Sequence, residues 1–312
     1  MHEIPDPLKR QVRQEAGFGC CKCGFPIIDY HHIIRCSNKP KDIMIFCPNH
    51  HREATEGAML KKEQRQYKSN PYNIERGFVE GQLKINQKTP VVTMGSNQLI
   101  GEGDLIVVDG ESLLSISINE GRLELSMTLY DENNNLVAEI KNNEWITGDN
   151  LPWDLESKYQ WLRLRRKLRD IELEINAKKH PILVRADMWK NGQNIQLTPK
   201  SISLNGVAVK NFTMKNLCFV AGYFDIDTSL QKASIEINPR FPKASMIVDP
   251  DIKTRVKKGL SQLERLLLHE KREKQRNCKH EFEIEDRGIE RFIHLVCKKC
   301  GLVMIKNRDE KS

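Results

Sequence analysis

Apolar residues in the middle of the chain occur in short runs or alternate with polar residues. Residues 113–118 form a mainly apolar run, while residues 123–127 and 171–175 alternate at every second position. A period of two residues is typical of a β-strand with one buried face. The pattern therefore predicts a β-rich domain over residues 91–249.

Turn-forming residues separate these segments. Asp109-Gly110, Glu120-Gly121 and residues 133–135 lie between apolar stretches, and Asn191-Gly192 and Asn205-Gly206 predict two further hairpins. The spacing of the turns fits both a β-sandwich and a β-solenoid, and it does not distinguish between them.

The segments on either side follow other patterns. Residues 1–88 combine a short helical start, short strands, a second helix and a group of cysteines. Residues 251–276 predict a long helix, and residues 277–312 contain a second group of cysteines. The chain is thus expected to be an α+β protein with several domains.

The long helix contains apolar residues at the spacing of a coiled-coil seam. Val256, Leu260, Leu263 and Leu267 are separated by four, three and four residues. These residues fill only about two heptads. Two interpretations follow: the helix forms a homodimer, or it docks on its own domain.

The charge of the chain is unevenly distributed. The net charge is +8 overall, with +5 over residues 1–90, −3 over residues 91–250 and +6 over residues 251–312. Basic ends suit a protein whose terminal modules contact nucleic acid, although charged runs are also common on solvated helix faces.

Cysteine usage and hydropathy indicate the compartment. No apolar run is long enough for a signal peptide or a membrane span, and the cysteines number nine, an odd count. We therefore expect a cytoplasmic protein without a membrane partner, in which clustered cysteines bind metal rather than form disulfides.

The first cysteine group predicts a structural zinc site. Cys20 and Cys23 are separated by two residues, and so are Cys47 and His50. Two such pairs can form a tetrahedral Cys3His site, which would stabilise a module with a small core. Cys21 and Cys36 remain outside this set, and either could replace a neighbouring ligand.

Two histidine doublets then suggest a division of roles. If His50 binds zinc, His51 is available together with His31 to hold a second, catalytic Mg²⁺ or Mn²⁺ ion. His32 would be a general base that activates water. A cation and a base are what hydrolysis of a phosphodiester requires.

The segments CCKCGFPIIDYHHII and IMIFCPNHHREATEGAM, followed by EQRQYKSNPYNI, resemble a bacterial branch of the HNH (ββα-metal) endonuclease family. The resemblance extends from Arg13 to Ile74. It implies a strand pair that carries the His-His-Ile segment and a helix that begins near His50. It also implies the roles given above for His31, His32 and His51, and zinc ligation by Cys20, Cys23, Cys47 and His50.

The chain departs from the family pattern at two positions. Asp42 replaces the middle asparagine, which braces the loop of the catalytic motif, and we count Asp42 among the catalytic candidates. Thr55 replaces a further histidine that many members carry. Two histidine ligands with waters suit Mg²⁺ or Mn²⁺ better than zinc, and Glu53 or Thr55 could assist.

The second cysteine group resembles a zinc ribbon. Cys278, His280, Cys297 and Cys300 provide four ligands, and the residues between the pairs alternate like a small hairpin. His294 is an alternative ligand. Such a module could hold the C-terminal segment together, contact nucleic acid, or do both.

Arginines provide the remaining candidates for contact with nucleic acid. Arg163, Arg165 and Arg166 form a basic patch in an otherwise acidic region, and Arg52 follows the second histidine doublet. Cys218 lies in an apolar segment and is expected in the core, as are the four tryptophans.

Together these features predict a metal-dependent HNH-type endonuclease that hydrolyses DNA. The family resemblance further implies a place in bacterial defence or mobile-element biology. One alternative is a zinc-containing protein that binds nucleic acid without cutting it. Another is a nuclease that is gated by a ligand-sensing central domain.

Overall fold

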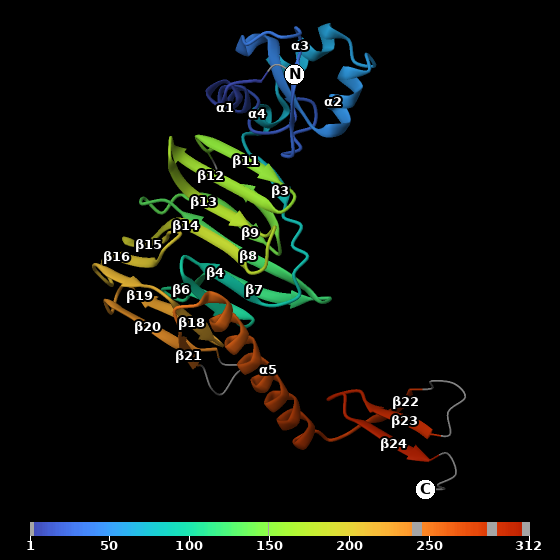
Figure 1. The fold of residues 1–312 in the computed structure, drawn as a ribbon, viewed down its shortest axis with the longest axis vertical. Helices are drawn as coiled ribbons and strands as arrows, with labels where there is room; N and C mark the ends of the chain where they lie inside the picture. Colours follow the sequence, from blue (N-terminus) through green and yellow to red (C-terminus); the bar gives the residue numbers. More distant parts are fainter. Residues whose placement is uncertain (1–2, 149, 239–244, 286–291, 308–312) are drawn as a thin grey trace. The chain divides into compact units, whose positions relative to one another are not determined.

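The computed structural model describes residues 3–148, 150–238, 245–285 and 292–307 (Figure 1). The chain forms two compact units, Met1–Gly259 and Leu260–Ser312. Both contain β-structure, and the first also contains several short helices. None of the helices in the described residues is long and apolar enough to cross a bilayer. The fold is mixed α and β, with strands predominating.

The first unit begins with a small module in which two strands are followed by a helix. Strand β1 pairs antiparallel with β2, and Phe46, at the end of β2, is fully buried. Helix α2 starts two residues later, which gives the order β-β-α. The elements are α1 (Asp6–Glu15), β1 (Asp29–His32), the 3-10 helix η1 (Pro40–Asp42), β2 (Ile43–Phe46), α2 (Pro48–Thr55), α3 (Lys61–Ser69) and α4 (Tyr72–Arg76).

The remainder of the first unit contains two large sheets. The eight-stranded sheet has the order β20-β19-β6-β7-β8-β9-β10-β3. Its strands are β3 (Glu80–Gln82), β6 (Gly103–Val108), β7 (Glu111–Asn119), β8 (Arg122–Tyr130), β9 (Leu136–Lys141), β10 (Glu144–Thr147), β19 (Gly222–Asp227) and β20 (Lys232–Ile237).

The eleven-stranded sheet has the order β11-β12-β13-β14-β4-β5-β18-β21, with β15, β16 and β17 added as a side branch from β14. Its strands are β4 (Val91–Met94), β5 (Asn97–Ile100), β11 (Asp154–Lys158), β12 (Trp161–Lys167), β13 (Asp170–Asn176), β14 (Ile182–Lys190), β15 (Gln193–Leu197), β16 (Ile202–Gly206), β17 (Phe212–Met214), β18 (Leu217–Val220) and β21 (Ser245–Val248).

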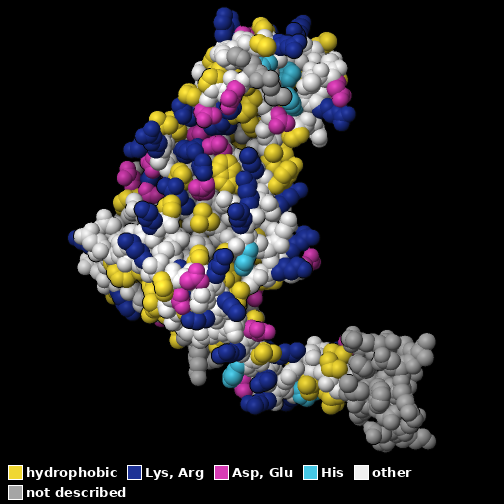
Figure 2. Space-filling model, in the orientation of Figure 1, with side chains coloured by type: hydrophobic (Ala, Val, Ile, Leu, Met, Phe, Trp, Pro, Cys, Tyr) yellow, Lys and Arg dark blue, Asp and Glu magenta, His cyan; other side chains and the backbone are white. Residues whose placement is uncertain are grey.

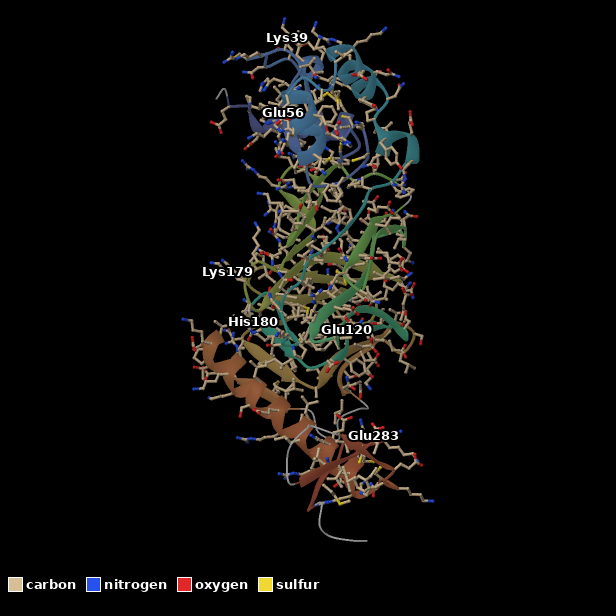
Figure 3. The ribbon with its side chains drawn as sticks, turned by 90° about the vertical axis from the view of Figure 1, so that its right-hand side faces the viewer. Lys39, Glu56, Glu120, Lys179, His180 and Glu283 are labelled. Atoms are coloured by element: carbon tan, nitrogen blue, oxygen red, sulfur yellow. The ribbon has the colours of Figure 1, made fainter. Side chains whose placement is uncertain are left out.

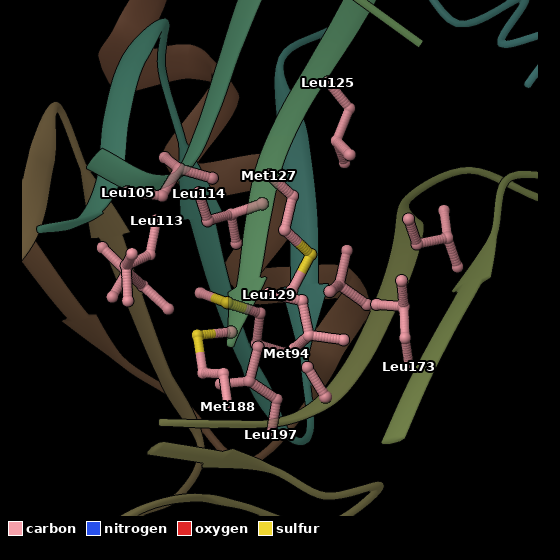
Figure 4. Packing of buried hydrophobic residues seen from close by; sticks show 14 of the residues in the cluster. Met94, Leu105, Leu113, Leu114, Leu125, Met127, Leu129, Leu173, Met188 and Leu197 are labelled. Atoms are coloured by element: carbon pink, nitrogen blue, oxygen red, sulfur yellow. The ribbon is translucent and has the colours of Figure 1, made fainter. Parts of the chain in front are cut away.

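The two sheets share one apolar core, as in a sandwich. Leu114 and Met127 of the eight-stranded sheet belong to the same buried cluster as Leu173 and Met188 of the other sheet (Figure 4). In β8, buried and half-buried residues alternate after the exposed Arg122. Alternating residues therefore supply the core from both sheets, which favours the sandwich over the solenoid.

Most of the predicted turns are confirmed. Asp109-Gly110, Glu120-Gly121 and Asn191-Gly192 each join neighbouring strands, and all six residues have positive φ angles. Positive φ at both central positions gives a two-residue turn whose twist matches that of the flanking strands. Residues 133–135 also lie between strands, β8 and β9.

The predicted hairpin turn at Asn205-Gly206 is wrong. Both residues belong to β16, where Asn205 pairs with Asn194 and Gly206 with Gln193. A Cβ atom at Gly206 would lie 2.4 Å from the carbonyl oxygen of Gly192. Glycine is needed here for close approach of two backbones, and the chain turns only after it.

The module and the sandwich are connected by the backbone and by buried side chains. Strand β3 pairs with β10, and Val79 and Leu83 beside it are part of the sandwich core. Arg13 of α1 donates two hydrogen bonds of 2.8 Å from Nη2 to the carboxylate of Asp154 on β11, and one of 2.6 Å from Nη1 to the Tyr30 hydroxyl on β1. The segment before residue 88 thus contributes to both the small module and the sandwich.

Helix α5 (Ile252–Arg276) begins in the first unit and ends in the second. Its first turns dock on the sandwich. Arg255 is 2% exposed and donates to the Gln98 side chain at 2.7 Å, and a Cβ atom at Gly259 would lie 2.4 Å from Ile100. Docking on its own domain is therefore confirmed for the start of the helix, whereas the homodimer stays a prediction.

The second unit contains a three-stranded antiparallel sheet after the helix. Its strands are β22 (Phe282–Glu285), β23 (Phe292–Cys297) and β24 (Val303–Asn307). The expected small hairpin corresponds to the pairing of β22 with β23, in which Phe282 is opposite Cys297.

The predicted burial of Cys218 and the four tryptophans in the core is partly confirmed. Cys218 is fully buried, and Trp145 and Trp161 are at most 9% exposed. Trp153 and Trp189 are only half-buried. Trp153 stacks against Arg10, whose guanidinium carbon lies 4.6 Å from its ring centroid.

We predict that Asp154→Asn destabilises the protein by about 3 kcal/mol, because Arg13 and Arg165 would lose a buried carboxylate partner. The side chain of Asp154 is 3% exposed and bonds both arginines. Urea unfolding measures the change. The control is Asp6→Asn, which removes an exposed ion pair with Lys9 and should cost less than about 1 kcal/mol. Equal effects of the two substitutions would contradict the prediction.

A carboxylic acid is also buried in the eleven-stranded sheet. Glu172 of β13 is 4% exposed, and its nearest cation is Arg166, 3.8 Å away. Burial raises the pKa of Glu172 to about 7, against the opposing effect of Arg166. The folded protein therefore binds this proton more tightly than the unfolded chain does.

The stability contributed by protonated Glu172 is present below the unfolded pKa and is lost as pH rises through about 7. We predict that Glu172→Gln flattens the fall in melting temperature between mildly acidic and mildly alkaline pH. Melting curves across this range test it, with the exposed Glu132→Gln as control. Parallel profiles for wild type and Glu172→Gln would show that the carboxyl titrates normally.

Candidate metal centres

Cys20, Cys23, Cys47 and His50 converge as expected for a zinc site. Their ligand atoms all lie within 4.8 Å of one another. The sulfurs of Cys23 and Cys47 are 3.9 Å apart, and Nδ1 of His50 lies 3.3 Å from the sulfur of Cys20 and 3.4 Å from that of Cys47. Zinc–sulfur bonds of about 2.3 Å in a tetrahedral site would place sulfurs about 3.8 Å apart. The donor set and its spacing thus fit zinc.

The local backbone explains how Cys20 and Cys23 come together. The N–H of Gly24 donates to the carbonyl of Cys20 at 2.8 Å, and Gly24 has a φ of +75°. The buried amide of Asn73 in α4 donates to the Gly24 carbonyl at 3.0 Å. A hydrogen bond from Cys20 lowers the pKa of Cys23 to about 5, so a thiolate is available for metal binding.

The second cluster repeats this design. Cys278, His280, Cys297 and Cys300 also lie with all ligand atoms within 4.8 Å. The Cys278 and Cys297 sulfurs are 3.7 Å apart, and the Cys300 sulfur is 3.4 Å from Nδ1 of His280. The N–H of Gly301 donates to the Cys297 carbonyl at 2.8 Å, as Gly24 does to Cys20. A second zinc ion fits here.

The alternative ligands are placed differently. Cys21 is buried and Cys36 is exposed, and neither belongs to a cluster within the described part of the chain. The backbone of His294 pairs with Glu285 and Ile305, but its side chain lies outside the described residues.

The remaining histidines of the two doublets meet on the module. The rings of His31 on β1 and His51 on α2 have centroids 5.4 Å apart. With metal–nitrogen bonds of about 2.1 Å, two imidazoles on one ion would hold their centroids about 5 Å apart. Figure 2 shows histidine side chains gathered on this part of the surface. Burial lowers the pKa of His31, which favours the neutral form that binds metals.

His32 differs from His31 in its surroundings. Its Nε2 atom is buried and has no hydrogen-bond partner among the described residues. The His32 side chain as a whole is half-buried. The backbone of His32 is opposite Ile43, at the end of the β1–β2 pair.

Asp42 lies at the other end of the loop that follows His32. It is 4% exposed, and its Oδ2 atom accepts a hydrogen bond of 2.8 Å from the Ser37 hydroxyl. Its carbonyl accepts from the N–H of Ile33 at 2.8 Å, and Arg65 lies 3.8 Å from Oδ1. These contacts close the loop between β1 and β2, so the carboxylate serves as a brace.

The two residues expected to assist the ion have other partners. The Thr55 hydroxyl donates to the His51 carbonyl at 2.7 Å, within α2. Glu53 accepts a hydrogen bond of 2.8 Å from Lys22, which lowers its pKa.

Two side chains not predicted from the sequence contact the histidine pair. Oδ2 of Asp29 lies 3.7 Å from Nδ1 of His51, and Oε1 of Gln64 lies 3.2 Å from Nε2 of His31. Asp29 is two residues before His31 on β1, so the alternation of a strand could have placed them on one face. Gln64 gave no such signal, because it lies among polar residues of α3.

The four candidate arginines are all paired with carboxylates. Arg52 is exposed and can exchange its partner, whereas the other three are partly buried on the sheet. The pairs are Arg52–Glu56, Arg163–Glu174, Arg165–Asp154, Arg165–Glu156 and Arg166–Asp187.

Comparison of the chain with protein-family models, with curated proteins and with solved structures finds no match. The site must therefore be interpreted from its own residues.

We predict two zinc ions per chain by elemental analysis. Cys47→Ser should lose the ion of the first cluster and Cys297→Ser that of the second, because each removes one of four ligands. Cys36→Ser, an exposed cysteine outside both clusters, should retain two. Two zinc ions in the Cys47→Ser protein would contradict the assignment of the first site.

Proposed function

We propose that the protein is a metal-dependent endonuclease of the HNH type that hydrolyses phosphodiester bonds of DNA. The observation that supports this most is the meeting of His31 and His51, with ring centroids 5.4 Å apart. It occurs beside a Cys3His cluster, in a module whose strands and helix follow the order β-β-α.

His31 and His51 would hold a divalent cation, with water and phosphate oxygens as its remaining ligands. Two imidazole nitrogens with several waters suit Mn²⁺ or Mg²⁺. Such an ion stabilises negative charge on the phosphate and on the leaving 3′ oxygen.

His32 would act as the general base through Nδ1. Nε2 is buried without a hydrogen-bond partner among the described residues, which leaves Nδ1 for this role. Nδ1 would accept a proton from the attacking water. At the same time the water oxygen would bond to phosphorus, and the bond between phosphorus and the leaving 3′ oxygen would break. The brace from Asp42 to Ser37 would hold the following loop in place.

Basic side chains beside the site could contact the DNA backbone. Arg35, Lys39 and Lys41 lie in the loop from β1 to η1 and in η1 itself, and all are exposed. None of them forms an ion pair with another described residue. Lys39 lies at the outer edge of the module in Figure 3. Cations without carboxylate partners are the groups that neutralise phosphates.

A second candidate is a protein that binds nucleic acid without cutting it. The engagement of the Thr55 hydroxyl with its own helix favours this candidate, since it leaves two histidines where many family members have three. A third candidate, a nuclease gated by the central domain, is supported by Arg13, which bonds both Tyr30 beside His31 and Asp154 of the sandwich.

We predict that wild-type protein nicks or linearises plasmid DNA with Mn²⁺ or Mg²⁺ and not with EDTA. His32→Ala should lower the cleavage rate by about 100-fold or more, because a general base is lost. The variant should keep its zinc content and its DNA affinity. The matched control is His269→Ala, an exposed histidine of α5 outside both clusters.

If well-folded wild-type protein binds DNA but leaves it intact with either ion, both alone and with added cell extract, the nuclease proposal fails in favour of the second candidate. If cleavage occurs only when cell extract is added, the third candidate applies.

A further inference from the structure

We infer that Gln64 is a positioning residue that holds His31 as its Nε2–H tautomer and so presents Nδ1 as the metal-facing nitrogen. The inference rests on the proposed function for the metal, but the tautomer itself can be tested without any metal in the site.

Gln64 is held in one place by the fold. The residue is 3% exposed. It follows Glu63, whose carboxylate accepts a hydrogen bond of 2.7 Å from the Leu60 N–H at the start of α3. The backbone N–H of Gln64 donates to the carbonyl of Leu60 at 3.0 Å. A buried side chain at an anchored helix start has few alternative rotamers.

The orientation of the Gln64 amide follows from its two partners. One end of the amide lies 3.1 Å from the carbonyl of Met59, which can only accept a hydrogen bond. That end must be the NH₂ group. The amide oxygen then faces Nε2 of His31 at 3.2 Å. The reverse orientation would place the amide oxygen against the Met59 carbonyl oxygen, and both are acceptors.

The tautomer of His31 follows from the amide. An amide oxygen accepts but does not donate, so Nε2 of His31 must carry the proton. In a neutral imidazole the other nitrogen, Nδ1, then holds the lone pair. Metal-binding histidines commonly have their second nitrogen fixed by such an acceptor.

His51 has a corresponding partner. Oδ2 of Asp29 lies 3.7 Å from its Nδ1 atom. A water that bridges this gap would fix the ring and leave Nε2 of His51 for the ion. The site would thus use Nδ1 from one imidazole and Nε2 from the other.

The test uses full-length protein with ¹⁵N-labelled histidine, with its zinc retained and no Mn²⁺ or Mg²⁺ added. Long-range ¹H–¹⁵N correlation spectra at mildly alkaline pH distinguish the two tautomers of His31. The variants are Gln64→Met, which removes the acceptor at similar length, and Gln64→Glu, which in its protonated form keeps the acceptor for His31 and a donor for the Met59 carbonyl. Gln66→Met, exposed on the same helix, is the matched control. Mn²⁺ affinity is measured separately by electron paramagnetic resonance.

We expect the Nε2–H tautomer in wild type, Gln64→Glu and Gln66→Met, and a mixture in Gln64→Met. Affinity for Mn²⁺ should fall by about 10-fold or more in Gln64→Met and be restored in Gln64→Glu. Full zinc content in each variant would show that the module is folded.

An Nδ1–H tautomer in wild type would overturn the inference, as would a folded Gln64→Met protein that keeps both the tautomer and the Mn²⁺ affinity. If wild type shows Nε2–H but binds no Mn²⁺, the orienting role of Gln64 stands and the proposed metal-dependent function fails. The two failures are therefore distinguishable.

Discussion

The convergence of Cys20, Cys23, Cys47 and His50 is the constraint on which the N-terminal module depends. The buried cluster of the module is smaller than that of the sandwich, and the four ligands join the turn after α1 to the start of α2. His51 is adjacent to His50, so the bond geometry that fixes one histidine also limits where the next can lie. The cluster thereby helps to place His51 beside His31.

Secondary structure explains why adjacent histidines of each doublet have different partners. On a strand, neighbouring side chains leave on opposite faces, so His31 contacts His51 and Gln64 while His32 has a different environment. On the helix, His50 contacts the two cysteine sulfurs while His51 contacts Asp29. Secondary structure alone thus gives adjacent identical residues different surroundings.

Sequence patterns predicted the local features well and the long-range ones poorly. Alternation located β8 and β13, and the Cys/His spacing located both clusters, because these signals depend on near neighbours. Strand β3 was missed since its residues, Glu-Gly-Gln, do not alternate. Gln64 was missed because its burial comes from packing against β1 and Met59, which a polar helix does not reveal.

Pairing partners within the sandwich have a consequence for the order of assembly. Ile182 lies parallel to Val92, Phe219 to Leu99, and Phe224 to Ile106. Each pair joins residues far apart in the chain, which makes loop closure slow. During synthesis, β1, β2 and α2 can assemble soon after residue 55 has emerged from the ribosome, whereas the sheets cannot close until β18 and β19 have followed. The module would therefore form before the sandwich, and Arg13 would contact Tyr30 before it acquires the carboxylate of Asp154.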